Sequence, residues 1–400
     1  MAHMLFAKGD TWKRLRTICN PAFTSGKLKS YMGLLKNCEN DLIQLFIEKE
    51  GQTFDIRETF QLLTLEVIGS VGFGIEFNAI RSVGRNNDFL KKLREFLHSS
   101  SDPPVSIMSS LFLSEIVPII RKGIFLQEKI GSGFFGPIHK ICDNIRDIIT
   151  LRQQGDIRKN DILQSMVDIC ANEVSATGNK KSMTEFEMVS QSLLLFVAGY
   201  ETTSSSLGFA SFLLAKNPDK QEKLAKELAR AFPRNEKGEL PSIDYDTVMS
   251  SIPYLDWVCR ETLRLYPVAL NFLSRLVFDE GTVEGYHIPK NLEAVYVDTW
   301  TIHRNPDYWG PVDPNNFYPE RFAPEQSEGR HPAAYLPFGL GPRQCLGMRL
   351  ALLEMKFTLT NMLLRFRIDL PYPDFKLEVN SINGPMTAVG GVPVKLSSRV

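Results

Sequence analysis

The sequence has few cysteines, no surplus of charge of either sign and no long apolar run. Its six cysteines are scattered and form no CxxC or CxxCH motif, so we interpret them as reduced thiols in a cytosol-facing protein. Lysine plus arginine equals aspartate plus glutamate at 46 each, which leaves no overall basic field for a nucleic acid. We therefore expect no nucleic-acid partner.

No stretch approaches the roughly 20 apolar residues that a membrane-spanning helix needs. The most apolar stretch, 188–200, is short and is bracketed by Glu187 and Glu201, which favours a buried helix segment. Residues 1–10 lack the apolar core of a signal peptide. With 43% hydrophobic and 23% charged residues, the chain of 400 residues is predicted to be globular, with one large core or two smaller ones.

Helical patterns dominate before residue 279, and a stretch rich in proline, glycine, asparagine and aromatics follows over 279–332. Within the helical part, Thr184 and Glu187 have the spacing of a capping box, in which each side chain bonds the other's backbone N–H. The pattern continues to Asn217 and Pro218, interrupted only by single glycines. The sequence therefore predicts one long central helix over 185–216, about 32 residues and roughly 48 Å in length.

Small and polar residues interrupt the apolar face in the middle of this helix, in the run AGYETT over 198–203. Ala198 and Gly199 are expected to open space beside the helix. A threonine hydroxyl in such a gap can bond a carbonyl one turn back, which is the common structural role, or a bound ligand. The helix pattern alone leaves both roles open.

Cys345 lies in a glycine-punctuated loop, FGLGPRQCLG over 338–347, with Arg343 two residues before it. Apolar residues then recur at helical spacing from Leu346 onward, so we expect Cys345 to lie at a helix N-terminus. Exposed N–H groups and the positive end of the helix dipole would stabilise a negatively charged sulfur there. The glycines allow tight turns and the close approach of a flat ligand.

Two further charged patterns lie on predicted helices. Glu261 and Arg264 are three residues apart on one face between largely apolar flanks, and Arg321 follows in the run FYPERF. Trp12 and Arg16 share one face of a helix that we expect Asp10 to cap; spacing alone is equally typical of an ordinary amphipathic helix. Further on, the runs 282–289 and 293–297 suggest a β-hairpin.

These motifs together resemble the cytochrome P-450 family. The loop over 338–347 has every fixed position of the haem-binding signature F-x-x-G-x-R-x-C-x-G, and 198–203 resembles the oxygen-activation motif A-G-x-[DE]-T-[TS]. Glu261 with Arg264 matches the E-x-x-R element, 319–322 the P-E-R-F element, and Trp12 with Arg16 the W-x-x-x-R helix. The similarity covers nearly the whole chain and is greatest to the family-three drug-metabolising enzymes and thromboxane synthase.

The resemblance implies a mainly α fold with small β-sheets: a triangular, helix-rich domain over 1–400 that binds haem b (iron protoporphyrin IX). It implies that Cys345 is the axial metal ligand, that Thr202 orients dioxygen at the iron and relays a proton, and that Glu201 helps to deliver protons. It also implies three further sets of residues. Haem binding would involve Trp12, Arg16, Arg275, Phe338, Arg343 and Gly347; substrate binding Leu194, Val197, Ala198, Ala269 and Leu270; and structural support Glu261, Arg264 and Arg321.

The implied activity is that of a haem-thiolate monooxygenase, which inserts one oxygen atom from dioxygen into a lipophilic small molecule. Electrons would come from NADPH through cytochrome P-450 reductase, which in this family meets a basic face that includes Lys13, Arg14, Lys27 and Lys29 here; cytochrome b5 is a further expected partner. Two alternatives remain: a haem-thiolate isomerase of the thromboxane synthase kind, which needs no reductase, and a truncated, non-catalytic chain.

Location also follows from the resemblance. Microsomal relatives lie at the cytosolic face of the endoplasmic reticulum membrane, and they carry an N-terminal anchor and the first strands of a small sheet before the helix of Trp12. We expect this chain to lack both. The apolar segment 111–135 is predicted to make peripheral membrane contact.

Overall fold

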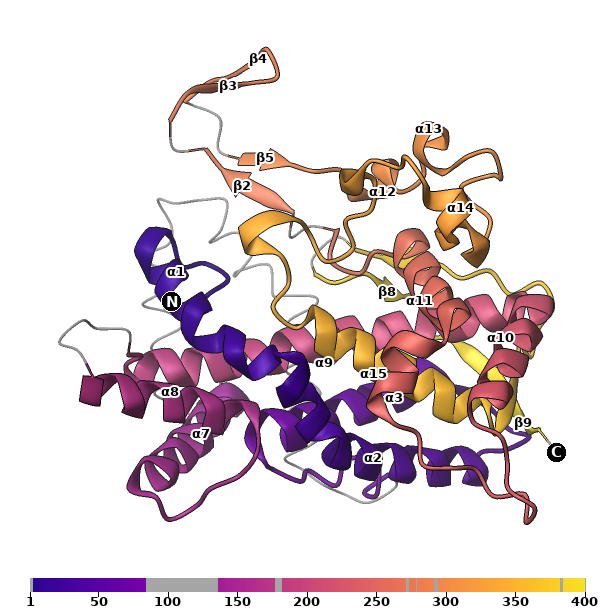
Figure 1. Cartoon of the computed structure of the whole chain (residues 1–400), viewed down its shortest axis with the longest axis horizontal. Helices are drawn as coiled ribbons and strands as arrows, with labels where there is room; N and C mark the ends of the chain where they lie inside the picture. The colour runs from indigo at the N-terminus through magenta and orange to yellow at the C-terminus, as the bar shows by residue number, and fades with distance from the viewer. Residues whose placement is uncertain are drawn as a thin grey trace. The chain divides into compact units, whose positions relative to one another are not determined.

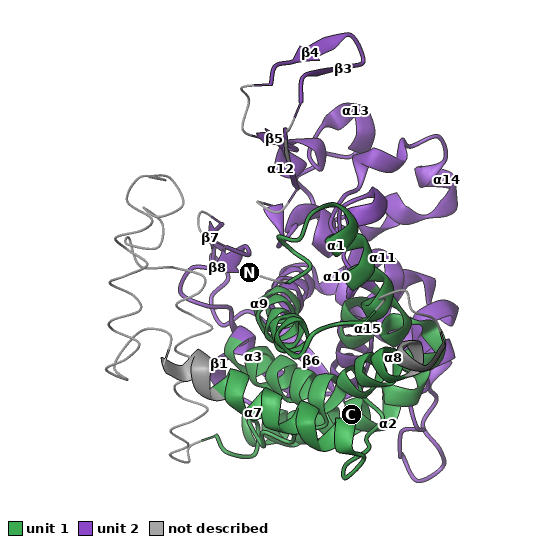
Figure 2. Ribbon diagram, turned by 90° about the vertical axis from the view of Figure 1, so that its left-hand side faces the viewer, with its two compact units in different colours: residues 1–50, 58–204, 349–354 green, residues 51–57, 205–348, 355–400 purple. Residues whose placement is uncertain are grey.

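The computed structural model describes residues 3–83, 136–176, 182–270, 273–277, 279–290, 294–381 and 384–399. These residues form two compact units (Figure 2). Unit 1 takes the described residues within Met1–Glu50, Glu58–Ser204 and Arg349–Glu354, and unit 2 those within Gly51–Arg57, Ser205–Met348 and Met355–Val400. The assignment of a single haem domain over 1–400 stays a prediction, and the segment 111–135 lies outside the described residues.

Unit 1 is built from helices whose apolar residues recur on one face. In α2 the buried residues include Leu28, Leu35 and Leu42, spaced by two helical turns, so one side of the helix packs inward. The elements in chain order are α1 (Gly9–Cys19), η1 (Asn20–Phe23), α2 (Ser25–Glu48), α3 (Ile56–Val67), the π-helix η2 (Ile68–Phe73), α7 (Gly136–Gln154), α8 (Ile162–Ala176) and α9 (Glu185–Lys216) (Figure 1). The residues of α9 after Ser204 belong to unit 2.

The predicted long helix is confirmed, since α9 runs over Glu185–Lys216. Its capping box also forms: Glu187 N–H donates to Thr184 Oγ1 at 3.2 Å, and Thr184 N–H donates to Glu187 Oε2 at 2.9 Å. Both bonds satisfy backbone donors that a helix N-terminus would otherwise leave unpaired. The predicted cap of α1 is wrong, because α1 begins at Gly9 with Lys8 before it, which places Asp10 inside the first turn.

Unit 2 combines helices with many short turns. Its longer helices are the end of α9 after Ser204, α10 (Pro218–Ala231), α11 (Pro253–Leu265) and the later part of α15 (Met348–Leu363). Between α11 and α15 the proline-rich stretch forms single turns around a buried cluster of Trp309, Phe322 and Ala334. These turns are α12 (Thr299–Ile302), α13 (Pro306–Trp309), η5 (Pro319–Phe322), α14 (Pro324–Ser327), η6 (Pro332–Ala334) and η7 (Gly341–Arg343), with the π-helix η3 (Thr247–Ser251) before α11.

All described strands belong to small antiparallel sheets, so the fold is mainly α with small sheets, as predicted. The largest sheet has the order β1 (Thr53–Asp55), β9 (Pro393–Ser398), β6 (Phe366–Asp369). Two-stranded sheets join β2 (Ser274–Leu276) to β5 (Ala294–Tyr296), β3 (Gly281–Val283) to β4 (Tyr286–Ile288), and β7 (Val379–Asn380) to β8 (Thr387–Ala388). No described helix has both the length and the apolar character required to cross a bilayer.

The predicted hairpin is correct in part. A tight turn at Glu284 and Gly285, with φ of 49° and 82°, closes β3 onto β4 within the first of the two runs. Two positive φ angles are the mark of the type I′ turn that matches strand twist. The second run pairs elsewhere, as β5 with β2. In Figure 2 the β3–β4 hairpin extends away from the rest of unit 2.

Candidate functional site

The Cys345 loop begins the candidate site in unit 2. Its thiol is exposed, although cysteine is among the residue types most often buried. The Cys345 N–H donates to the Phe338 carbonyl at 2.9 Å, which closes the loop on itself. Gly339 and Gly341 take φ of 73° and 77°, angles that L side chains rarely adopt. The expected helix start is wrong: α15 begins at Met348, so Cys345 precedes the helix by three residues.

Two guanidinium groups lie near this loop. Arg343 is exposed in the turn before Cys345, and Arg275 is exposed on β2, where its Nη1 donates to the Ser274 carbonyl at 2.7 Å. Partial burial and the neighbouring charge of Arg275 lower the pKa of Arg343. Two like charges that repel each other favour a bound anion between or beside them. Arginine also binds carboxylates through a bidentate fork.

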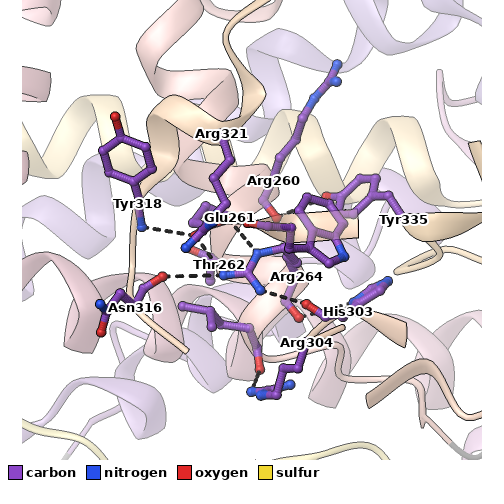
Figure 3. A network of polar contacts seen from close by, with 12 residues as sticks. Arg260, Glu261, Thr262, Arg264, His303, Arg304, Asn316, Tyr318, Arg321 and Tyr335 are labelled. Carbon is purple, nitrogen blue, oxygen red and sulfur yellow. Dashed lines mark hydrogen bonds and ion pairs between the residues drawn. The ribbon is translucent and has the colours of Figure 1, made fainter. Parts of the chain in front are cut away.

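A buried carboxylate organises the rest of this part of unit 2. Glu261 on α11 pairs with Arg264 at 2.7 Å and with Arg321 on η5 at 3.3 Å, and the three side chains are between 0% and 3% exposed. It also accepts the Tyr318 N–H at 3.0 Å. Figure 3 shows the two guanidinium groups approaching the one carboxylate. The structure thus brings together the three residues that the sequence grouped as structural.

The remaining N–H groups of the two arginines donate to backbone carbonyls. Arg264 Nη1 donates to the His303 carbonyl at 2.7 Å and Nη2 to the Asn316 carbonyl at 3.4 Å. Arg321 donates to the carbonyls of Trp309, Val312 and Asp313. Two buried charges therefore hold the short turns between α12 and η5 in place.

His303 links this network to the chain that leads into the Cys345 loop. It is fully buried, its Nδ1 lies 3.1 Å from the Arg264 carbonyl, and its Nε2 accepts the Leu336 N–H at 2.8 Å. Since a carbonyl can only accept, Nδ1 carries the proton and the ring is neutral. Burial, with added repulsion from Arg264 and Arg304, lowers the pKa of His303 from 6.5 to about 3.

In unit 1, four of the predicted site residues lie on one face of α9 and stay accessible: Leu194, Val197, Ala198 and Thr202. Leu193, Leu195 and Gly199 in the same stretch are also only half-buried. Thr202 Oγ1 donates to the Ala198 carbonyl at 2.7 Å, which is the back-bond that the sequence left as one alternative. The expectation for Gly199 is wrong, because Ile68 of η2 fills the space beside it: a Cβ on Gly199 would lie 2.9 Å from Ile68 Cδ1.

Glu201 differs from its neighbour Thr202 in being buried, with 3% of its surface exposed. Gln61 Nε2 of α3 donates to Glu201 Oε2 at 3.1 Å, across 140 positions of sequence. One turn further along α3, the Thr64 hydroxyl donates to the Tyr200 carbonyl at 3.1 Å. Helix α3 therefore contacts α9 through polar groups at the segment that the sequence singled out.

Trp12 and Arg16 are both half-buried on α1. Arg14, between them, forms a pair of hydrogen bonds to the Glu187 carboxylate, with Nη1 at 3.1 Å and Nη2 at 2.5 Å, and it also donates to the Ser182 carbonyl. This contact fastens α1 to the capped start of α9. It also means that Arg14 is neutralised within unit 1, unlike the exposed Lys13.

The remaining predicted residues lie in unit 2 and are half-buried: Ala269, Leu270, Phe338 and Gly347. Sequence reasoning missed three contacts that position the site, made by Gln61, His303 and Glu187. Only the last had a signal, because the charged pair of Arg14 and Glu187 includes a capping-box residue. A lone glutamine on an apolar face and a lone histidine in an irregular stretch carry no local pattern.

Comparisons with known proteins identify the family to which the chain is similar. A model of the family described as Cytochrome P450 matches residues 1–386. Cytochrome P450 3A27 of Oncorhynchus mykiss is 33% identical over 367 residues, which cover 90% of this chain and 67% of that protein. Cytochrome P450 3A6 of Oryctolagus cuniculus is 33% identical, covering 91% and 69%. Lithocholate 6-beta-hydroxylase of Mesocricetus auratus is 33% identical, covering 90% and 69%.

Replacing Glu261 by glutamine should destabilise the fold strongly. The change leaves two buried guanidinium groups without a counter-charge, which lowers the free energy of unfolding by about 3 to 5 kcal/mol. Chemical denaturation measures the loss. The control is Asp143→Asn, which breaks the exposed pair of Asp143 and Arg146 at 2.6 Å and should change stability little. Equal effects of the two substitutions would contradict the structural role of Glu261.

Acid should destabilise the fold through His303. Because the pKa of His303 is about 3 in the folded chain, this ring binds a proton below pH 6.5 in the unfolded chain but stays neutral in the folded chain until the pH approaches 3. Stability from this group is thus complete above pH 6.5 and falls by about 1.4 kcal/mol per pH unit between roughly 6 and 4. Unfolding titrations of His303→Asn should lack that part of the slope. The control is the same substitution at the exposed His287, which should keep the slope. An unchanged slope in His303→Asn would refute the role of His303 in acid destabilisation.

Proposed function

Since this chain belongs to the cytochrome P450 family, we propose that it inserts one oxygen atom from dioxygen into a lipophilic small molecule such as a steroid, a fatty acid or a xenobiotic. The family assignment makes it a haem b monooxygenase that uses electrons derived from NADPH through a reductase. The observation that carries the proposal is the exposed Cys345 thiol on its glycine loop, accompanied by Arg343 and Arg275.

The donor set in unit 2 fits a haem. An exposed thiol on a loop whose glycines have positive φ can approach a flat ring closely, and the loop hydrogen bond from Cys345 N–H to Phe338 fixes its backbone. The mutual repulsion of Arg343 and Arg275 would be relieved by a propionate. Phe338 and Gly347 would border the ring. In unit 1, Trp12 and Arg16 are proposed to bind a propionate as well.

Cys345 is proposed as the residue whose thiolate would bind the haem iron. When bound, haem supplies the activation of dioxygen, and thiolate ligation favours cleavage of the O–O bond. The protein's own contribution is to hold this thiol in place: the network of Glu261, Arg264 and Arg321 fixes the turns that precede the loop, and His303 bonds the backbone of Leu336.

The accessible face of α9 is proposed to bind substrate and to handle protons. Leu194, Val197 and Ala198 present apolar surface, and the accessible Thr202 hydroxyl is proposed to orient a polar atom. The buried Glu201 next to it is proposed to hold the proton that Thr202 passes on. Apolar contacts from Ala269 and Leu270 are proposed to complete the substrate set.

Partners and location are proposed from the same premise. The exposed cations Lys13 and Lys29 favour an acidic flavin-containing reductase, whereas Arg14 is occupied by Glu187. Cytochrome b5 is a further proposed partner. We place the protein at the cytosolic face of the endoplasmic reticulum membrane, with peripheral contact through 111–135.

Isotopic labelling tests the monooxygenase function. One relative is named lithocholate 6-beta-hydroxylase, which makes a steroid acid the first probe for this chain. With labelled dioxygen, NADPH and a reductase, we expect one labelled oxygen atom in the product. Thr202→Ala should lower product per NADPH at least roughly ten-fold, and the buried Thr203→Ala should change it little.

Two results would contradict this function. Unlabelled product would show that the inserted oxygen does not come from dioxygen. Product that forms equally without NADPH and reductase would favour the haem-thiolate isomerase instead.

A further inference from the structure

Gln61 uses its amide nitrogen to bond Glu201, whereas its amide oxygen has no donor among the described residues. The Gln61 side chain is 0% exposed, and its amide faces the carboxylate at 3.1 Å. Because a carboxylate accepts hydrogen bonds and has no proton to donate, the amide nitrogen must be the atom that faces it. The amide oxygen therefore points elsewhere within the buried interior.

Among the residues that the structure describes, Gln61 Oε1 is a buried acceptor with no donor. Two hydroxyls of the contact between α3 and α9 are already used, since Thr64 donates to the Tyr200 carbonyl at 3.1 Å and Ser204 donates to the same carbonyl at 2.8 Å. A buried acceptor without a partner is costly and is usually satisfied by an ordered water molecule. The group that would satisfy Gln61 Oε1 is therefore a small hydrogen-bond donor.

Glu201 needs such a neighbour if it supplies protons. Its carboxyl is 3% exposed, so it has almost no contact of its own with bulk water, whereas Thr202 beside it is accessible. After each proton it gives away, the carboxylate must be reprotonated from inside the protein. Gln61 donates a hydrogen bond to this carboxylate and also offers an acceptor for a water molecule.

We propose that a water molecule binds Gln61 Oε1 beside Glu201 and that Gln61 is the positioning residue of this internal proton relay. The inference rests on the proposed role of Glu201. In the relay, the water receives a proton from a further water molecule that is connected to bulk solvent, as it passes one of its own protons to the Glu201 carboxylate. The water is left neutral, Glu201 becomes a carboxylic acid, and no bond other than those to hydrogen changes.

The contact is also separate from the packing around it. Thr64 lies on the same helix and contacts the backbone of α9 instead of the Glu201 side chain. It therefore offers a matched control: Thr64→Val disturbs the polar contact between α3 and α9 and keeps the Gln61 amide. Gln61→Met keeps the length of the side chain and removes both its donor and its acceptor.

A crystal structure of the unsubstituted, haem-loaded chain at high resolution tests the water site without reference to activity. We expect electron density for a water molecule at hydrogen-bonding distance from Gln61 Oε1. A site without water, or one in which another side chain donates to Oε1, would overturn the proposal.

Kinetic assays test the relay. Gln61→Met should raise the ratio of hydrogen peroxide to product roughly ten-fold, the effect of losing one hydrogen bond to a charged group, and Thr64→Val should not. A normal ferrous carbon monoxide spectrum in both variants shows that each folds and binds haem. Equal ratios in the two variants would refute the role of Gln61.

Glu201→Gln separates this inference from the proposed function. If Glu201→Gln raises the peroxide ratio and Gln61→Met does not, the Gln61 relay fails and the role of Glu201 stands. If Glu201→Gln has no effect, the proposed role of Glu201 fails, and the relay fails with it.

Discussion

The burial of one carboxylate between two guanidinium groups is the interaction on which unit 2 depends. Glu261 is wholly buried, and so are both of its partners, so none of the three charges is solvated by water. Such a group is stable only when opposite charges lie in contact and the hydrogen-bond donors that remain are used. Arg264 and Arg321 meet that condition by donating to backbone carbonyls across the turns from His303 to Asp313. His303 in turn accepts a hydrogen bond from the Leu336 N–H and so fixes the backbone there. The Cys345 loop follows directly, which is why a charge cluster far from the thiol in sequence governs its placement.

Helix α9 plays the corresponding part in unit 1. Its start is fixed by the capping box and by Arg14, and its middle packs through Phe196, whose ring stacks on Phe73 at 4.5 Å. Gly199 admits Ile68, and Glu201 takes the amide of Gln61. With these contacts made on its other sides, the helix leaves a short accessible face at Thr202. Steric packing and polar contacts together thus select which groups of a largely buried helix remain available for chemistry.

Much of this was predictable from sequence where the signal was local. The span of α9 follows from Thr184, Glu187 and the proline after Asn217, and the Glu261 network follows from motifs. The failures have physical causes. Asp10 lies in the first turn of α1 instead of capping it, because the helix begins earlier than expected, and residue propensities do not fix a helix start so closely. Cys345 precedes α15 because its N–H bonds Phe338 across the loop, and Gly199 serves packing against η2. Gln61 and His303 act through contacts distant in sequence, which no local pattern encodes.

The central claim is that Cys345 provides the thiolate ligand, and the ferrous carbon monoxide difference spectrum of the haem-loaded chain tests it most directly. If Cys345 is that ligand, the unsubstituted chain shows a Soret band at the position of thiolate-ligated haem. Replacing the half-buried Cys142 by alanine should keep that band, and replacing Cys345 should abolish it. A thiolate band that survives in Cys345→Ala, or its absence from the unsubstituted haem-loaded chain, would contradict the account.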